Sequence, residues 1–353
     1  KEKQSFVFEK ISSEPVPSVL RDFSAPVKLT SDISDKNLAF LMVHDSDGFN
    51  RWEAGQSYAL RTISKMLKGG DAPKDFIESY GELLADKNAD PALLARALAL
   101  PDISFIGQHN RPTDPPAIHV AREKLYSSIL TKYRRELKQI YEANIERGGF
   151  SVTPQAMGKR ALQNTVLGIL ATDLDAESIA LAKDQYDKAE TMTGRVGALS
   201  VLADSNSKER DEAFAHFYGK FKEHLLVIDK WFALQAAAVR PDTVESLKKL
   251  RIHPDFNIRN PNRVRSLYAA FAMNNPVCFH AADGAGYNFL TDAIIELNGI
   301  NPQITSRLLT PMRDWKNYTQ DRQEKIKASL QKILAQPKLS ADVFEIADKS
   351  YKG

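Results

Sequence analysis

The chain has 353 residues, of which 43% are hydrophobic and 26% are charged, and its 48 basic and 45 acidic residues give a net charge of +3. This balance argues against a nucleic-acid-binding protein, which usually carries a basic block, and no apolar run approaches the ~18 residues of a membrane span. A single cysteine, Cys278, excludes an internal disulfide framework. Together with the lack of a secretory segment, it predicts a cytoplasmic protein.

The first 28 residues differ from the remainder. Residues 4–10 alternate in polarity, with Phe6 and Phe8 on one face, which is the period of a β-strand. Prolines then interrupt an extended segment. Because a lone strand or hairpin is marginal in water, we expect one or two strands that complete a sheet lying before Lys1.

From about Ser34 the pattern is helical almost to the end. Gly69-Gly70 closes a first stripe formed by Trp52, Gln56, Ala59, Leu60, Ile63 and Leu67. A long helix opens at Pro115-Pro116. Further helical patterns cover 154–171, 175–185, 189–203, 208–221, 224–239, 242–250, 261–273, 285–299, 302–312, 319–334 and 340–350. This density of helices and short turns predicts a mainly α fold, a superhelical stack of antiparallel helix pairs of the armadillo or HEAT type.

The sequence shows no self-contained active site. No two of its seven histidines have the i, i+4 spacing that presents two zinc ligands on a helix, and neither H-E-x-x-H nor G-x-S-x-G occurs. Cys278 and His280 are two apart, so on a helix they point in different directions. No pair of carboxylates stands out from solvated helix faces. We therefore predict no catalytic residue, no metal site and no cofactor within this chain.

Asn-Pro steps occur at 260–261, 275–276 and 301–302. Asparagine is a favoured N-cap and proline suits the first helical position, so each step predicts a helix start. The first step puts Arg263 and Arg265 in the first turn and a half. The third puts Gln303 in the first turn and Arg307 one turn later on the same face.

Cations near a helix N-terminus cost about 0.3–1 kcal/mol against the helix dipole. Two interpretations stay open for these arginines. Each could pair with a neighbouring Asp or Glu on the surface. Alternatively, the helix starts could line a cavity that holds a carboxylate, which a guanidinium binds with two parallel hydrogen bonds.

Seven segments, spread in order along the chain, resemble the C-terminal part of the bacterial aminopeptidase N (alanyl aminopeptidase) family of gluzincin-type zinc metallopeptidases. They are FSAPVKL (23–29), FNRWEAGQ (49–56), DKWFALQA (229–236), NPNRVRSL (260–267), FHAADGAGYNFL (279–290), NPQITSRLL (301–309) and RQEKIKASL (322–330). The resemblance implies that residues 1–28 are the terminal strands of a truncated β-sandwich domain and that residues 29–353 are the C-terminal helical domain.

The family's zinc motif and its amine-binding G-x-M-E-N motif belong to domains absent from this sequence. The resemblance therefore implies zinc in the full-length enzyme, none in this chain, and no activity of the chain alone. Its implied partners are its own catalytic and β-sandwich domains and short peptides, with neither nucleic acid nor membrane.

In the family, the helical domain closes over the catalytic domain and makes the active site an internal chamber. By resemblance, Gln303 would approach the pocket for the first substrate side chain. Arg265 and Arg307 would line the channel on the side of the leaving peptide, where their role would be positioning. Arg263 is unassigned.

The alternative is a free-standing helical-repeat scaffold that binds a protein or peptide in a concave groove. An unpaired edge carrying Phe6 and Phe8 favours the aminopeptidase, because a scaffold has no use for it. Nucleic-acid binding would require a steep dependence on salt, and the near-neutral charge disfavours it.

Overall fold

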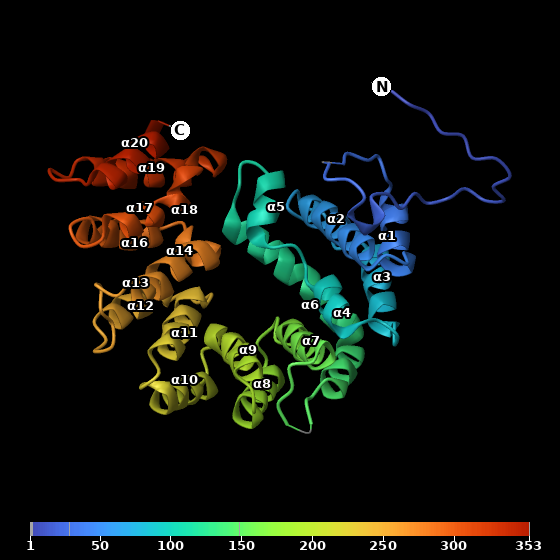
Figure 1. Cartoon of the computed structure of the whole chain (residues 1–353), viewed down its shortest axis with the longest axis horizontal. Coiled ribbons are helices and arrows are strands. Elements are labelled where there is room, and N and C mark those ends of the chain that lie inside the picture. The colour runs from blue at the N-terminus through green and yellow to red at the C-terminus, as the bar shows by residue number, and fades with distance from the viewer. Residues whose placement is uncertain (1–2, 28, 148, 353) are drawn as a thin grey trace.

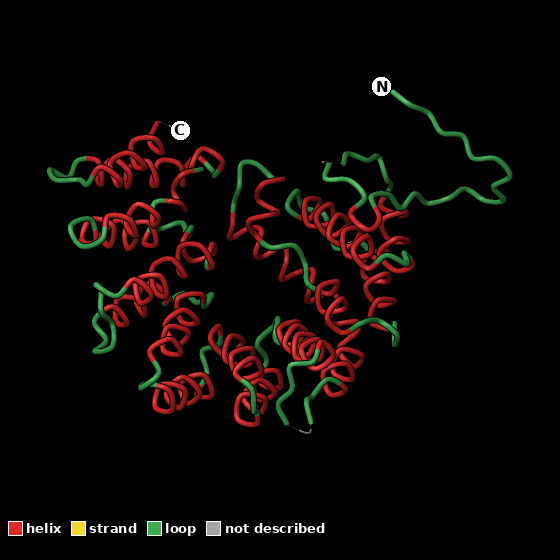
Figure 2. Tube along the Cα trace, in the orientation of Figure 1, coloured by secondary structure: helices red, strands yellow, loops and turns green. Residues whose placement is uncertain are grey.

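A computed structural model describes residues 3–27, 29–147 and 149–352. Within those ranges the regular structure is helical apart from one isolated bridge between Thr113 and Tyr318, and the helices follow one another around a curved arc (Figures 1 and 2). The predicted mainly α superhelix is therefore confirmed. None of the described helices is both long and apolar enough to cross a membrane.

The first part of the arc ends in one long helix. It comprises α1 (Asp35–His44), α2 (Gly48–Met66), α3 (Lys74–Ala85), α4 (Pro91–Leu98), α5 (Ile103–His109) and α6 (Pro115–Ala143). Helix α6 opens at the predicted proline pair and runs along the inner side of the arc (Figure 1). The buried face of α2 is rotated from the predicted stripe, since Tyr58 and Met66 are buried whereas Trp52 and Leu60 are half-buried.

The middle of the arc shows the predicted pairing most clearly. Its helices are α7 (Pro154–Leu170), α8 (Ala176–Lys188), α9 (Met192–Asp204), α10 (Lys208–Phe221), α11 (Leu225–Ala237) and α12 (Thr243–Arg251). Helices α7, α9 and α11 pack side by side on the inner side, with α8 and α10 behind them (Figure 1). Leu199, Leu202 and Phe232 are fully buried between the layers. Each such side chain contributes roughly 1.5–3 kcal/mol by leaving water.

The last part begins with a helix interrupted by a π-helical turn. Its elements are α13 (Pro261–Val264), the π turn η2 (Arg265–Ala269), α14 (Ala270–Asn274), α15 (Pro276–Phe279), α16 (Ala285–Leu297), α17 (Pro302–Leu308), α18 (Thr310–Arg313), the 3₁₀ turn η3 (Trp315–Asn317), α19 (Gln320–Leu334) and α20 (Ala341–Lys352). Gly286 is required in α16 because a Cβ there would lie 2.5 Å from the Phe279 carbonyl oxygen.

All three Asn-Pro steps start helices, as predicted. Asn260 accepts hydrogen bonds from the backbone N–H groups of Asn262 and Arg263. Asn275 accepts one from Cys278 at 3.1 Å, and Asn301 one from Ile304 at 3.1 Å. The side chain satisfies N–H groups that have no carbonyl partner within the helix, which is why this dipeptide fixes a helix start.

The strands expected near the N-terminus are not formed in this structure. Residues 3–27 are irregular except for a 3₁₀ turn, η1 (Arg21–Phe23), and Phe6 and Phe8 are 72% and 79% exposed. Residues 1, 2 and 28 lie outside the described residues. A strand needs a neighbour for its N–H and C=O groups, and none of the described segments pairs with this one.

A contact between two distant segments closes the arc, and no pattern in the sequence predicts it. The loop before α6 meets the start of α19, where the Thr113 N–H donates to the Asn317 carbonyl at 2.7 Å and the Thr319 N–H donates to the Thr113 carbonyl at 3.2 Å. These bonds join segments about two hundred residues apart, so the first and last parts of the arc hold each other in place.

Candidate functional site

The three residues predicted to line a channel lie on two separate elements. Gln303 and Arg307 are exposed and one turn apart on α17, which packs against α16 and α20. Arg265 is exposed at the start of η2, which packs against α11, α13 and α14. Among the described residues neither arginine has an acidic partner. The guanidinium of Arg265 donates instead to the Asn262 side-chain oxygen.

The dipole argument applies differently to each arginine. Helix α17 ends at Leu308, so Arg307 lies in its last turn, where the dipole favours a cation. Arg263, left unassigned from sequence, is a structural residue. Its side chain is buried, pairs with Asp229 at 2.8 Å and lies 4.8 Å from the ring centre of Phe232. The surface-pair interpretation thus fails for Arg265 and Arg307, while Arg263 makes a buried pair.

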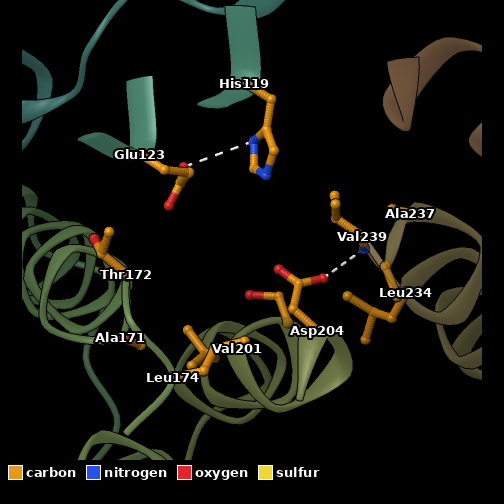
Figure 3. A pocket seen from close by; sticks show the side chains of 13 residues that line it. His119, Glu123, Ala171, Thr172, Leu174, Val201, Asp204, Leu234, Ala237 and Val239 are labelled. Carbon is orange, nitrogen blue, oxygen red and sulfur yellow. Dashed lines mark hydrogen bonds and ion pairs between the residues drawn. The ribbon is translucent and has the colours of Figure 1, made fainter. Parts of the chain in front are cut away.

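A cavity of about 450 Å³ lies on the inner side of the arc. Its wall is formed by α6 and by the C-terminal ends of α7, α9 and α11 (Figures 1 and 3). The lining residues are His119, Glu123, Gly168, Ala171, Thr172, Leu174, Ser200, Val201, Asp204, Leu234, Ala237, Ala238 and Val239.

The titratable side chains of the cavity face one another across it. Figure 3 shows His119 and Glu123 projecting from α6 and Asp204 projecting from the opposite side. His119 Nδ1 lies 3.7 Å from Glu123 Oε1. The Val239 N–H donates to Asp204 Oδ1 at 2.7 Å, and this bond fixes the carboxylate at the end of α9.

Burial sets the proton affinities of these groups. It raises the pKa of Asp204 to about 6, although the Val239 hydrogen bond opposes it, and the negative charge of Glu123 adds to the rise. Burial also raises the pKa of Glu123 and lowers the pKa of His119, with the positive charge of Arg122 adding to the second effect. The site therefore holds a neutral imidazole and two carboxyl groups that give up their protons reluctantly.

The described part of the chain offers no group of three or more His, Cys, Asp or Glu side chains arranged to hold a metal ion. Zinc therefore does not fit the residues that the structure describes. His119, Glu123 and Asp204 can accept hydrogen bonds and attract a cation, but they do not form a nucleophile–base pair.

Sequence reasoning missed this cavity, although two signals were present. His119 and Glu123 have the i, i+4 spacing that places side chains together on a helix. Asp204 is the last residue of α9, where the helix dipole disfavours a carboxylate. Neither signal indicates that the two segments face each other, since this depends on the curvature of the arc.

Comparison with known proteins shows which family the chain belongs to. Residues 35–352 match the model described as a domain of unknown function (DUF3458_C) with ARM repeats. The chain belongs to the DUF3458_C family. Residues 1–32 match a second model, described as a domain of unknown function (DUF3458) with an Ig-like fold.

Two relatives of this DUF3458_C chain are both named aminopeptidase N. It is 37% identical over 354 aligned residues, 99% of its length, to aminopeptidase N of Escherichia coli (strain K12), and 36% identical over 97% of its length to aminopeptidase N of Caulobacter vibrioides. A solved structure of Legionella pneumophila aminopeptidase A in complex with aspartic acid superposes with a TM-score of 0.88 at 28% identity, covering 98% of this chain. The resemblance to bacterial aminopeptidase N is confirmed.

The DUF3458_C chain spans only part of these proteins. It covers 41% and 40% of the two aminopeptidases N and 42% of the Legionella chain.

Proposed function

We propose that this chain is the non-catalytic helical region of an aminopeptidase that removes N-terminal residues from peptides. Similarity to aminopeptidase N along 99% of the chain carries the proposal. In it, the arc closes over a catalytic domain elsewhere in the same enzyme, and its inner side becomes part of the wall that short peptides pass. That catalytic domain supplies the zinc.

The exposed polar side chains of the last helices support the peptide-lining part of the proposal. Arg265 and Arg307 are accessible cations with no acidic partner among the described residues, and Gln303 shares a face with Arg307. A guanidinium fork binds the carbonyl oxygens or the terminal carboxylate of a peptide. Such bonds hold the substrate in register and break no bond themselves.

The N-terminal segment supports the partnership with a β-domain. The side chains of Phe6, Val7 and Phe8 are 72–85% exposed, and such a run of exposed apolar residues is typical of a surface that another domain covers. In the proposal, residues 1–28 complete a β-sandwich and residues 29–353 form the helical domain. Cys278 is unpaired, which suits a reducing compartment, and we place the enzyme in the cytoplasm.

An arylamide assay tests the proposal. The chain alone, with zinc counted in the same sample, should hydrolyse no alanyl arylamide and bind no stoichiometric zinc. A polypeptide that carries the family's zinc motif should hydrolyse the arylamide when this chain is joined to it. Hydrolysis by the chain alone with one zinc per chain would contradict this division of labour. A peptide-binding scaffold would instead leave the activity of the joined polypeptide unchanged.

A further inference from the structure

Three helices end at the inner cavity with the same polarity. Alternate helices of a superhelical stack run in the same direction, so α7, α9 and α11 all bring their C-terminal ends to it. Ala171, Asp204 and Ala238 are the lining residues at these ends. Each C-terminus carries a partial negative charge from carbonyl groups that no helical N–H satisfies. The cavity is therefore electronegative even before its side chains are counted.

Two carboxyl groups add to this field, and each nearby arginine already has partners, among them the Ser205 carbonyl beside Asp204, to which Arg240 donates. Glu123 and Asp204 face each other across the cavity (Figure 3), and none of the described residues lining it is a lysine or arginine. The guanidinium of Arg122 donates to the Pro101 carbonyl at 2.8 Å, and Arg240 pairs with Asp242 at 2.9 Å.

Arg210 also lies close to this end of α9. It donates to the Ala203 carbonyl at 3.2 Å and pairs with Asp211 at 2.9 Å. The positive charges of Arg240 and Arg210 both lower the pKa of Asp204, but they do not cancel its rise. Burial of Asp204 thus leaves a carboxyl group whose charged form a further cation would stabilise.

We propose that this cavity binds the positively charged side chain of a lysine or arginine residue of a peptide. This inference rests on the proposed function, because a peptide must reach the inner side of the arc. Val201, Leu234 and Val239 provide an apolar wall for the methylene stem, while Glu123 and Asp204 receive the charged head. A volume of about 450 Å³ lies within the range of small-ligand pockets, roughly 300–1,000 Å³.

Protons should compete with the bound cation. The carboxyl of Asp204, with a pKa of about 6, loses its charge as the pH falls through that value. The groups that face it are Glu123 and His119 from α6, and Arg240 and Arg210 near the end of α9. Binding should therefore be strong at pH 7.5 and weak at pH 5, where Asp204 is largely neutral.

Two blocked peptides test the proposal directly on the whole chain. N-acetyl-Ala-Lys-Ala-amide carries one cation, and N-acetyl-Ala-norleucine-Ala-amide has the same methylene stem without it. Methyl signals of Val201, Leu234 and Val239 followed by NMR report both the affinity and the place of binding. At pH 7.5 the lysine peptide should bind about tenfold more tightly, the value of one charge-assisted hydrogen bond.

Matched double variants locate the effect. Glu123→Gln with Asp204→Asn keeps the hydrogen-bond acceptors, including that for the Val239 N–H, and removes both charges. Glu345→Gln with Asp187→Asn removes two exposed carboxylates that do not line the cavity, and each of them pairs with a lysine of its own helix, Lys349 in α20 and Lys183 in α8. The lysine preference should vanish in the first variant and at pH 5, and persist in the second.

The outcomes separate this inference from the proposed function. Equal affinities for the two peptides, or a lysine preference that survives in the cavity variant, would overturn the cation site and leave the peptide-lining role standing. Binding of neither peptide would also overturn it. The arylamide assay of the joined polypeptide then judges the proposed function independently.

Discussion

The guanidinium of Arg322 in α19 binds the carboxylate of Asp114, the N-cap of α6, through both of its terminal nitrogens. Nη2 lies 3.1 Å from Oδ1 and Nη1 lies 3.2 Å from Oδ2, across 208 positions of sequence. The Arg322 Nε also donates to the His280 carbonyl at 2.9 Å, and its side chain is only 7% exposed. This ion pair lies next to the backbone hydrogen bonds of Thr113, and together they hold the first and last parts of the arc in contact.

Replacing Arg322 by alanine should weaken the closure strongly. The change leaves the His280 carbonyl without its donor and removes the charged partner of the Asp114 carboxylate, which keeps only the Ala117 N–H. We expect the free energy of unfolding to fall by about 3 kcal/mol, measured by urea denaturation. Arg313→Ala is the matched control, since Arg313 is 64% exposed and its contact with Asp314 is 3.9 Å long. It should cost under about 0.5 kcal/mol, and equal losses in the two variants would contradict a role for the closure.

His280 should make the fold sensitive to acid. Burial lowers the pKa of this histidine to about 3, with the charge of Arg322 adding to the effect, and its Nδ1 lies 2.8 Å from the Tyr287 hydroxyl. In the unfolded chain the imidazole is protonated below about pH 6.5, whereas in the folded protein it stays neutral down to about pH 3. The stabilisation is therefore complete above about pH 6.5 and falls towards pH 3, by up to about 1.4 kcal/mol per pH unit.

A His280→Gln variant should flatten this dependence. Urea unfolding at pH 7.5, 6.0 and 5.0 gives the slope of the free energy of unfolding in each protein. The exposed His109 provides the control, and His109→Gln should keep the slope of the parent. An unchanged slope in His280→Gln would show that carboxyl groups alone cause the loss of stability in acid.

The charged carboxylate of Asp204 should destabilise the folded protein at neutral pH. Its carboxyl has a raised pKa of about 6 against an ordinary 3.8. The stabilisation that comes from its folded-state proton is full below about pH 3.8 and is lost as the pH rises through about 6. Asp204→Asn should therefore raise the free energy of unfolding by about 3 kcal/mol at pH 7.5, and by progressively less towards pH 4. Asp187→Asn, at an exposed carboxylate, should change it little at either pH.

Replacing Arg265 or Arg307 should lower the turnover of peptides more than the turnover of a single-residue arylamide. In the aminopeptidase of our proposal, Arg307→Ala or Arg265→Ala removes a hydrogen bond to the part of a peptide beyond the cleaved bond. Turnover of tri- and tetrapeptides, measured as kcat/KM, should drop about tenfold, while turnover of an alanyl arylamide should be nearly unchanged. Arg135→Ala, at an 83% exposed arginine, serves as control. Equal losses on both substrates would contradict the channel assignment.

Local chemistry explains which parts of the fold could be predicted. The Asn260, Asn275 and Asn301 caps each satisfy N–H groups two or three residues away, so the dipeptide alone carries the information. The same holds for the long helix that opens at Pro115. The expected N-terminal strands are not formed in this structure, because a strand depends on a neighbour and none of the described segments pairs with residues 4–10.

The sequence by itself determined the helices, their starts and the kinship with aminopeptidase N, because capping, periodicity and segment identity are read within a few residues. Only the tertiary structure decided which side chains meet. Glu123 and Asp204 share a cavity, and Asp114 and Arg322 an ion pair, because small rotations between successive helix pairs add up to a closed arc. That sum depends on the packing of every layer, and no local pattern encodes it.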